Sequence, residues 1–211
     1  MNVQRLCDDA RVLWQFARGQ PAGGDHAARL QAFYAPQAAR YDAFRERLLH
    51  GRRELIAELA PARGAHLVEL GAGTGRNLGF LGDRVFDLRV SLVDLCPSLV
   101  AVARERVAGL PGVRVYEADA TRWQPDRPVD HVLLSYALTM MPDWEGVLDN
   151  ACRMLRRGGT LAVVDFYVSA AQPAAGRVRH GWLMRQGWPR WFGHDGVHLN
   201  PAHIDALAAR T

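Results

Sequence analysis

The sequence predicts an α/β protein built on a doubly wound, mainly parallel sheet, with helices ahead of the sheet at the N-terminus. Short, nearly continuous apolar runs alternate with helical patterns between residues 66 and 166, which is typical of parallel strands that are buried on both faces. A glycine-rich turn joins the first apolar run to the helix that follows, as in doubly wound folds that bind a ligand at this turn. The length of 211 residues suits a single hydrophobic core.

Each element is assigned from its periodicity and its flanking residues. The predicted strands are 66–70, 88–94, 113–117, 129–136 and 160–166. The predicted helices are 3–18, 76–81, 97–108, 143–155 and 200–210, with a further helical region over 26–60 that is interrupted near Pro36. Pro97 begins its helix, and Asn200 caps the last one ahead of Pro201, which are favoured positions for these residues. We therefore expect a helical lid over residues 1–60 and a ligand-binding domain over residues 61–211.

Composition narrows the class of protein. The sequence has no apolar run long enough to span a bilayer and no signal-peptide layout, so a cytoplasmic location is expected. The three cysteines lie far apart without a Cys-x-x-Cys pair, so neither a metal site nor a disulfide framework is predicted. The net charge is +4, and arginine supplies all of the Lys+Arg total.

The segment 170–194 concentrates this positive charge. It contains four arginines, two histidines and three tryptophans, and it contains no acidic residue. Such a segment fits an anionic surface of phospholipid headgroups, with the tryptophans lying at the bilayer surface. The same pattern also fits a solvated basic face whose tryptophans pack in a core or an interface. Both interpretations stay open from the sequence.

The most informative pattern is the turn Glu69-Leu70-Gly71-Ala72-Gly73-Thr74-Gly75. Glycine permits positive φ and close approach of a ligand, and the start of the next helix supplies N–H donors. Nicotinamide oxidoreductases use a similar turn, but they need glycine or alanine where this chain has Arg76. The acid at Glu69 suits a cationic amino group better than a pyrophosphate. The turn therefore favours S-adenosylmethionine, with a nicotinamide enzyme as the alternative.

Further candidate residues follow the predicted strands, at the edge where open α/β sheets bind ligands. Asp94 ends the second strand and is expected to accept hydrogen bonds from both hydroxyls of a ribose. Asp119, followed by Ala120, comes after the third strand and is expected to accept a hydrogen bond from an adenine amine. Ser135 and Tyr136 end the fourth strand and are expected to face the same crevice.

Between residues 67 and 166 the chain resembles class I S-adenosylmethionine-dependent methyltransferases, whose motifs match as ELGAGTG, LVDL, EADA and LLSYAL. The resemblance implies a Rossmann-like methyltransferase fold and adds Leu95 to the residues expected to contact S-adenosylmethionine. Folds of this family usually end with two further strands, which we expect to be missing here, leaving five parallel strands. The fourth-strand motif is not the Asp/Asn-Pro-Pro-aromatic form that acts on nucleobase amines, so no nucleic acid partner is expected.

The flanking segments 33–37, 41–52 and 191–197 are similar to the methyltransferase component of bacterial betaine-lipid synthesis. That resemblance implies an enzyme that adds three methyl groups to the amine of diacylglyceryl-homoserine, giving diacylglyceryl-trimethylhomoserine. It also implies peripheral contact with the inner face of the membrane, and it implies the aminocarboxypropyl transferase that makes the substrate as a partner. The alternatives are phosphatidylethanolamine or a small metabolite as the acceptor, and an inactive protein of the same fold that binds or regulates.

Methylation of an amine needs a deprotonated nitrogen and stabilisation of a cationic product. Tyr136, His194 and Asp165 are the candidate catalytic residues, and His194 ranks first among the possible bases. Tyr41 and Arg45 are expected to form a lid over the methionine end of the cofactor.

Overall fold

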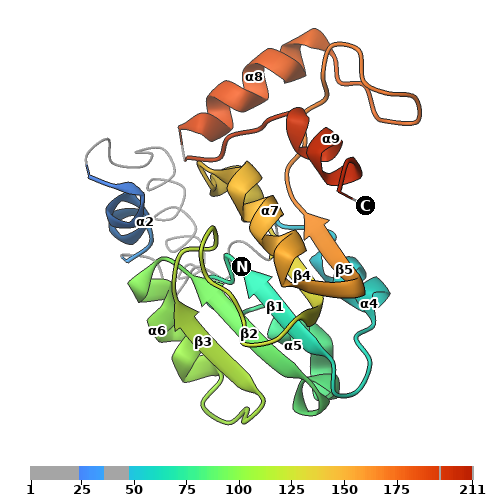
Figure 1. Cartoon of the computed structure of the whole chain (residues 1–211). Coiled ribbons are helices and arrows are strands. Elements are labelled where there is room, and N and C mark those ends of the chain that lie inside the picture. The colour runs from blue at the N-terminus through green and yellow to red at the C-terminus, as the bar shows by residue number, and fades with distance from the viewer. Residues whose placement is uncertain (1–23, 36–47, 195, 211) are drawn as a thin grey trace, which may run out of the picture.

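The computed structural model describes residues 24–35, 48–194 and 196–210, and it has an α/β architecture (Figure 1). Five strands form one parallel sheet in the order β3-β2-β1-β4-β5. They are β1 (His66–Leu70), β2 (Arg89–Asp94), β3 (Val113–Glu117), β4 (Val129–Ser135) and β5 (Leu155–Val164). The order reverses between β1 and β4, and sheets of this class bind ligands outside the strand ends at such a point. The predicted fold class and its five parallel strands are confirmed.

Helices cover both faces of the sheet. They are α2 (His26–Tyr34), α4 (Arg52–Leu59), α5 (Leu78–Leu81), α6 (Pro97–Arg106), α7 (Trp144–Met154), α8 (Trp182–Gly193) and α9 (Ala202–Ala208), with the 3-10 helices η1 (Gly82–Asp87) and η2 (Leu138–Met140). Side chains alternate along a strand, so Leu67 packs with α4, α5 and α6, whereas Val68 packs on the other face with α7. Leu30 and Phe33 of α2 pack against Leu99 of α6. Within the described part of the chain, no helix is both long and apolar enough to cross a membrane.

Some boundaries differ from the predicted ones. The helix predicted over 143–155 ends at Met154 and β5 begins at once, because Leu155 pairs with Val129 across a register shift in β4. The helix predicted over 76–81 is shortened to α5 and continues as η1. The last helix begins at Ala202, whose N–H donates to the side-chain oxygen of Asn200 at 3.0 Å. The helix start therefore lies one residue later than predicted, with Pro201 and not Asn200 at the N-cap position, although Asn200 still accepts a hydrogen bond from the first helical N–H.

The N-terminal region is described only in part. The helix predicted over 3–18 and the interruption after Pro36 lie outside the described residues. The end of this region, α4, packs Ile56 into the same core cluster as β1 and β2. The predicted division of the chain near residue 60 stays a prediction.

Candidate functional site

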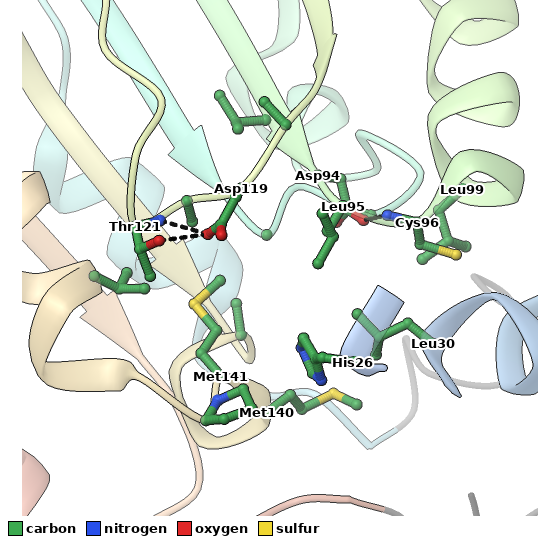
Figure 2. Close-up of a pocket in the computed structure, with 18 of the residues that line it drawn as sticks. His26, Leu30, Asp94, Leu95, Cys96, Leu99, Asp119, Thr121, Met140 and Met141 are labelled. Atoms are coloured by element: carbon green, nitrogen blue, oxygen red, sulfur yellow. Dashed lines mark hydrogen bonds between the residues drawn. The ribbon is translucent and has the colours of Figure 1, made fainter. Parts of the chain in front are cut away.

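A cavity of about 390 Å³ opens at the carboxyl ends of the strands, beside the switch point. Its walls come from the turn after β1, from the end of β2, and from the segments that follow β3 and β4. Figure 2 shows Asp94 and Asp119 on one side of the cavity, with His26, Met140 and Met141 on the other. Because His26 belongs to α2, a helix distant in sequence covers a site that the strand ends build.

The three glycines of the turn after β1 serve two purposes. All three have positive φ, at 68° for Gly71, 57° for Gly73 and 68° for Gly75. A Cβ at Gly71 would lie 2.5 Å from Ala137, and a Cβ at Gly75 would lie 2.8 Å from Leu92, so close packing excludes a side chain at both positions. A Cβ at Gly73 would meet no atom within 4 Å. Gly73 borders the cavity, so its missing side chain keeps ligand space open.

The N–H groups of this turn are not the free donors that the sequence suggested. Gly71 and Ala72 donate to the carbonyl oxygen of Val93 at 2.8 and 3.0 Å. The N–H of Gly75 donates to the carbonyl oxygen of Ala72 at 2.9 Å, and the N–H of Gly73 donates to Asp94 Oδ2 at 2.7 Å. These donors are therefore used within the protein, which argues against pyrophosphate binding here and leaves ligand recognition mainly to side chains.

Two predicted carboxylates border the cavity. Asp94 also accepts a hydrogen bond from the N–H of Cys96 at 2.9 Å, and burial raises the pKa of its carboxyl group. Asp119 Oδ1 accepts hydrogen bonds from the N–H and the hydroxyl of Thr121 at 2.8 and 2.7 Å, as Figure 2 shows. A carboxylate can accept about four hydrogen bonds, so both side chains can still accept hydrogen bonds from a ligand. Leu95 and Ala120 also line this cavity, and their contact with a cofactor stays a prediction.

A smaller hollow of about 60 Å³ adjoins the cavity and shares Gly71, Gly73 and Tyr136 with it. Three hydrogen-bonded polar side chains are buried in its wall. Arg52 Nη1 donates to Asn77 Oδ1 at 3.3 Å, and Asn77 Nδ2 donates to Glu69 Oε1 at 2.6 Å. Burial raises the pKa of Glu69 to about 7, although the bond from Asn77 and the charge of Arg52 act in the opposite direction. A cationic group placed in this hollow would favour the ionised carboxylate.

Ser135 and Tyr136 sit where β4 ends, and both border the smaller hollow. The Oγ atom of Ser135 is buried and has no hydrogen-bond partner among the described residues. Tyr136 has a φ of 53°, an uncommon conformation for a residue with a side chain that recurs at functional sites. Its hydroxyl donates to the carbonyl oxygen of His50 at 2.7 Å. Burial and the nearby Asp165 raise the pKa of Tyr136, so the phenol is protonated at neutral pH.

The other predicted residues lie differently. Asp165 follows β5 and does not line either hollow. Its carboxylate accepts hydrogen bonds from the hydroxyl and N–H of Thr139 at 2.7 and 3.1 Å, so it fastens η2 to the end of β5. His194 follows α8, is exposed, and also lies outside both linings. Tyr41 and Arg45 lie outside the described residues. The catalytic roles of Asp165 and His194 stay predictions.

The residues of the site that were not predicted from the sequence include His26, Arg52 and Asn77. Asn77 was placed inside a helix, although an asparagine just before an apolar run is a signal for a helix start, and it does precede α5. Burial lowers the pKa of His26, with Arg29 acting in the same direction, so its imidazole is neutral at pH 7. His26 and Arg52 reach the site through helix packing, which leaves no local pattern in the sequence.

Comparisons with known proteins agree with this geometry. Residues 67–159 match the model of a methyltransferase-domain family. A trans-aconitate 2-methyltransferase of Azoarcus sp. (strain BH72) is 32% identical over 123 residues, which are 58% of this chain and 47% of that protein. The chain spans about half the length of the curated relatives that it matches first.

Solved structures share the fold at lower identity. Phosphoethanolamine N-methyltransferase 2 of Haemonchus contortus, in complex with S-adenosyl-L-methionine, superposes with a TM-score of 0.67 and 16% identity, covering 90% of this chain and 44% of that one. The [4+2]-cyclase SpnF superposes with a TM-score of 0.64 and 19% identity, covering 91% of this chain and 74% of that one. The shared fold therefore includes a protein whose name describes another reaction, and the function has to be argued from the site.

Proposed function

We propose that the protein transfers methyl groups from S-adenosylmethionine to an acceptor amine, because residues 67–159 match the model of a methyltransferase-domain family and the sheet has the strand order β3-β2-β1-β4-β5. One observation carries the proposal. The absent side chain of Gly73 keeps space open where the cavity and the smaller hollow meet, and the two spaces have Asp94 and Glu69 in their respective walls. When bound, S-adenosylmethionine supplies an electrophilic methyl group.

The residues present fit this cofactor group by group. Asp119 and Ala120 border the part of the cavity proposed for adenine, and Asp94 would accept from the ribose hydroxyls. Glu69 would receive the cationic amino group in the smaller hollow, while Arg52 provides positive charge for a carboxylate. The hydroxyl of Ser135, which has no partner among the described residues, would gain a hydrogen-bond partner there, and this would remove the cost of burying it alone.

The proposed acceptor is the amine of diacylglyceryl-homoserine. The resemblance of segments 33–37, 41–52 and 191–197 to betaine-lipid methyltransferases supports this acceptor. Under the proposal the protein acts at the inner face of the membrane, beside the aminocarboxypropyl transferase that makes the substrate. Phosphatidylethanolamine is an alternative acceptor of related chemistry.

The side chain proposed to orient the acceptor is Tyr136, which borders both hollows. Its hydroxyl donates a hydrogen bond to the carbonyl oxygen of His50. The lone pairs of the hydroxyl oxygen can therefore accept a hydrogen bond from an amine. The raised pKa keeps the phenol neutral, so Tyr136 positions the amine and does not remove its proton. His194 and Asp165 remain the proposed bases, and they would act through water because neither side chain lines the hollows.

A carboxylate acceptor is the second candidate, because trans-aconitate 2-methyltransferases are the named relatives in sequence. The chemistry differs in its proton requirement. A carboxylate is already ionised at neutral pH, whereas an amine has to lose a proton before its lone pair can react. An N-methyltransferase should therefore gain rate with rising pH over a range in which an O-methyltransferase for a carboxylate gains little.

Cofactor binding is tested by comparing Gly73→Val with Gly64→Val by calorimetry. Both glycines have positive φ, at 57° and 80°, and a Cβ would meet nothing within 4 Å at either. Valine should therefore strain the backbone to a similar degree at the two positions. Gly64, however, precedes β1 and lies at the edge of the sheet opposite to the cavity. Gly73→Val should abolish S-adenosylmethionine binding and Gly64→Val should retain it. A folded Gly73→Val protein that binds normally would contradict the placement of the cofactor.

The acceptor is tested by incubating the protein and S-adenosylmethionine with diacylglyceryl-homoserine in mixed micelles, with phosphatidylethanolamine, or with trans-aconitate. The products are then identified by mass spectrometry. Stepwise addition of one, two and three methyl groups to diacylglyceryl-homoserine is the expected result. A methyl ester of trans-aconitate would instead establish the second candidate. Cofactor binding without any product would favour an inactive or regulatory protein of the same fold.

A further inference from the structure

Helix α8 carries a row of large apolar side chains that face away from the protein. Leu183, Met184, Trp188 and Trp191 recur at helical spacing, which places them on one side of the helix. The exposed fraction is 76% for Leu183 and 71% for Trp191, and no residue of α8 is buried. Since the apolar side of a helix normally faces a core, this row, which we call the α8 stripe, requires a different explanation.

The other side of α8 attaches the helix beside the cavity. The ring of Phe192 lies 4.8 Å from that of Phe166, and the ring of Phe166 lies 4.8 Å from that of Tyr136 in the cavity wall. Just beyond α8, the N–H of His198 donates to the carbonyl oxygen of Thr139 in η2 at 2.7 Å. The stripe therefore points outward from a helix that is fixed next to the proposed active site.

Positive charge surrounds the α8 stripe. Residues 170–194 include four arginines and no acid. Arg177 forms an ion pair with Asp205 of α9, which joins this segment to the rest of the protein. Arg179, Arg185 and Arg190 lie on α8 or just ahead of it. Tryptophan and leucine flanked by arginine, without acids, are the composition of helices that lie in the interface of an anionic bilayer.

We propose that α8 is a membrane-docking helix that binds the surface of an anionic phospholipid bilayer. Trp188, Trp191 and Leu183 would enter the interface, and the exposed side chains of Arg179 and Arg190 would contact the lipid phosphates. Figure 1 shows α8 at the periphery of the molecule, beyond α7 and on the side toward which the strands point. The bilayer would then face the same end of the sheet as the cavity. This inference deepens the membrane location in the proposed function by naming the element that binds lipid, and it can be tested separately because docking needs neither cofactor nor acceptor.

The test is co-sedimentation of the full chain with vesicles, without S-adenosylmethionine. Vesicles of equal parts phosphatidylglycerol and phosphatidylcholine should bind the protein, and pure phosphatidylcholine should bind it weakly. Added salt should reduce binding to the anionic vesicles, because it screens the arginines. The double variant Leu183→Ser/Trp191→Ser should lower the partition coefficient by roughly tenfold or more, since two large apolar groups no longer enter the interface.

Phe86→Ser is the matched control. Phe86 is 64% exposed but belongs to η1, ahead of β2 and therefore at the opposite edge of the sheet. This variant should bind vesicles as the wild type does. Failure of the wild type to bind anionic vesicles, or equal loss of binding in Phe86→Ser, would overturn the proposal. A dimer that forms without vesicles and dissociates in the double variant would assign the stripe to a second copy and overturn it as well.

Discussion

The smaller hollow and helix α8 place their side chains in opposite ways, and each departs from what a folding chain normally does. The hollow buries Glu69, Arg52 and Asn77 in its wall, although charged residues are rarely buried. Helix α8 exposes tryptophan and leucine on a side that has no core to face. Both arrangements cost free energy relative to ordinary placement. The difference indicates which ligand each region suits: a small cation for the hollow and an extended apolar and anionic surface for α8.

After the loss of binding in Gly73→Val, the largest effect is expected when the carboxylate nearest the turn is removed. Asp94→Ala deletes the acceptor for the N–H groups of Gly73 and Cys96 and the proposed acceptor for two ribose hydroxyls. Hydrogen bonds to a charged group contribute roughly 1.5–3 kcal/mol each. S-adenosylmethionine affinity should therefore fall by at least about a hundredfold, measured by calorimetry.

Asp94→Asn serves as its control, because the amide keeps one oxygen and the side-chain volume. An intermediate affinity is expected for that variant. Equal affinity of Asp94→Ala and the wild type for S-adenosylmethionine would show that Asp94 does not bind the cofactor. The proposed cofactor site would then be wrong at this residue.

The buried carboxylate of Glu69 should make the stability of the protein depend on pH. Burial raises its pKa from 4.5 to about 7, so the unfolded chain loses this proton at a lower pH than the folded protein does. The contribution of Glu69 is most favourable below pH 4.5, falls as the pH rises to about 7, and is constant above that. At about 1.4 kcal/mol per pH unit, the loss is about 3 kcal/mol.

Glu69→Gln isolates this contribution from that of other titrating groups. The amide oxygen still accepts from Asn77, but the side chain no longer titrates. Urea unfolding at a series of pH values should show the variant gaining stability over the wild type between pH 4.5 and 7. The variant should also bind S-adenosylmethionine more weakly above pH 7, where the wild type offers a carboxylate. Parallel stability profiles would contradict the assigned pKa.

The two regions also differ in how far the sequence predicts them. Gly73, Asp94 and Asp119 follow strands of one parallel sheet, whose carboxyl ends meet at one edge, so their meeting was predictable. His26 and Arg52 were not, because helix packing brings them to the site from distant segments. Asp165 was predicted as a catalytic residue for amine methylation, yet its carboxylate accepts hydrogen bonds from Thr139. The position of an acidic residue after a strand predicts the edge of the sheet at which it lies. It does not predict which neighbouring residue donates hydrogen bonds to its carboxylate.

Helix α8 shows a related limit. No helix was predicted over this segment, and the spacing of its three tryptophans carries no information on what covers them. The sequence therefore left core packing and a bilayer surface as equal interpretations. Exposure in the folded protein argues against core packing, because none of the helix is buried, and it leaves an interface or a bilayer surface as the alternatives.

The smallest effect should come from the α8 stripe itself, measured as folding stability. Leu183→Ser/Trp191→Ser removes two of the large exposed apolar side chains, and the free energy of unfolding should change by no more than about 0.5 kcal/mol per site. Ile56→Ala removes a side chain that is 2% exposed in the core under α4, and it should cost about 2–5 kcal/mol. Urea unfolding of both variants makes the comparison. If the α8 variant lost as much stability as Ile56→Ala, the stripe would be packed against protein in solution, and its apolar side chains would be part of a core. A near-zero change, together with the loss of vesicle binding, would mean that these side chains contribute to the bound state and not to the fold.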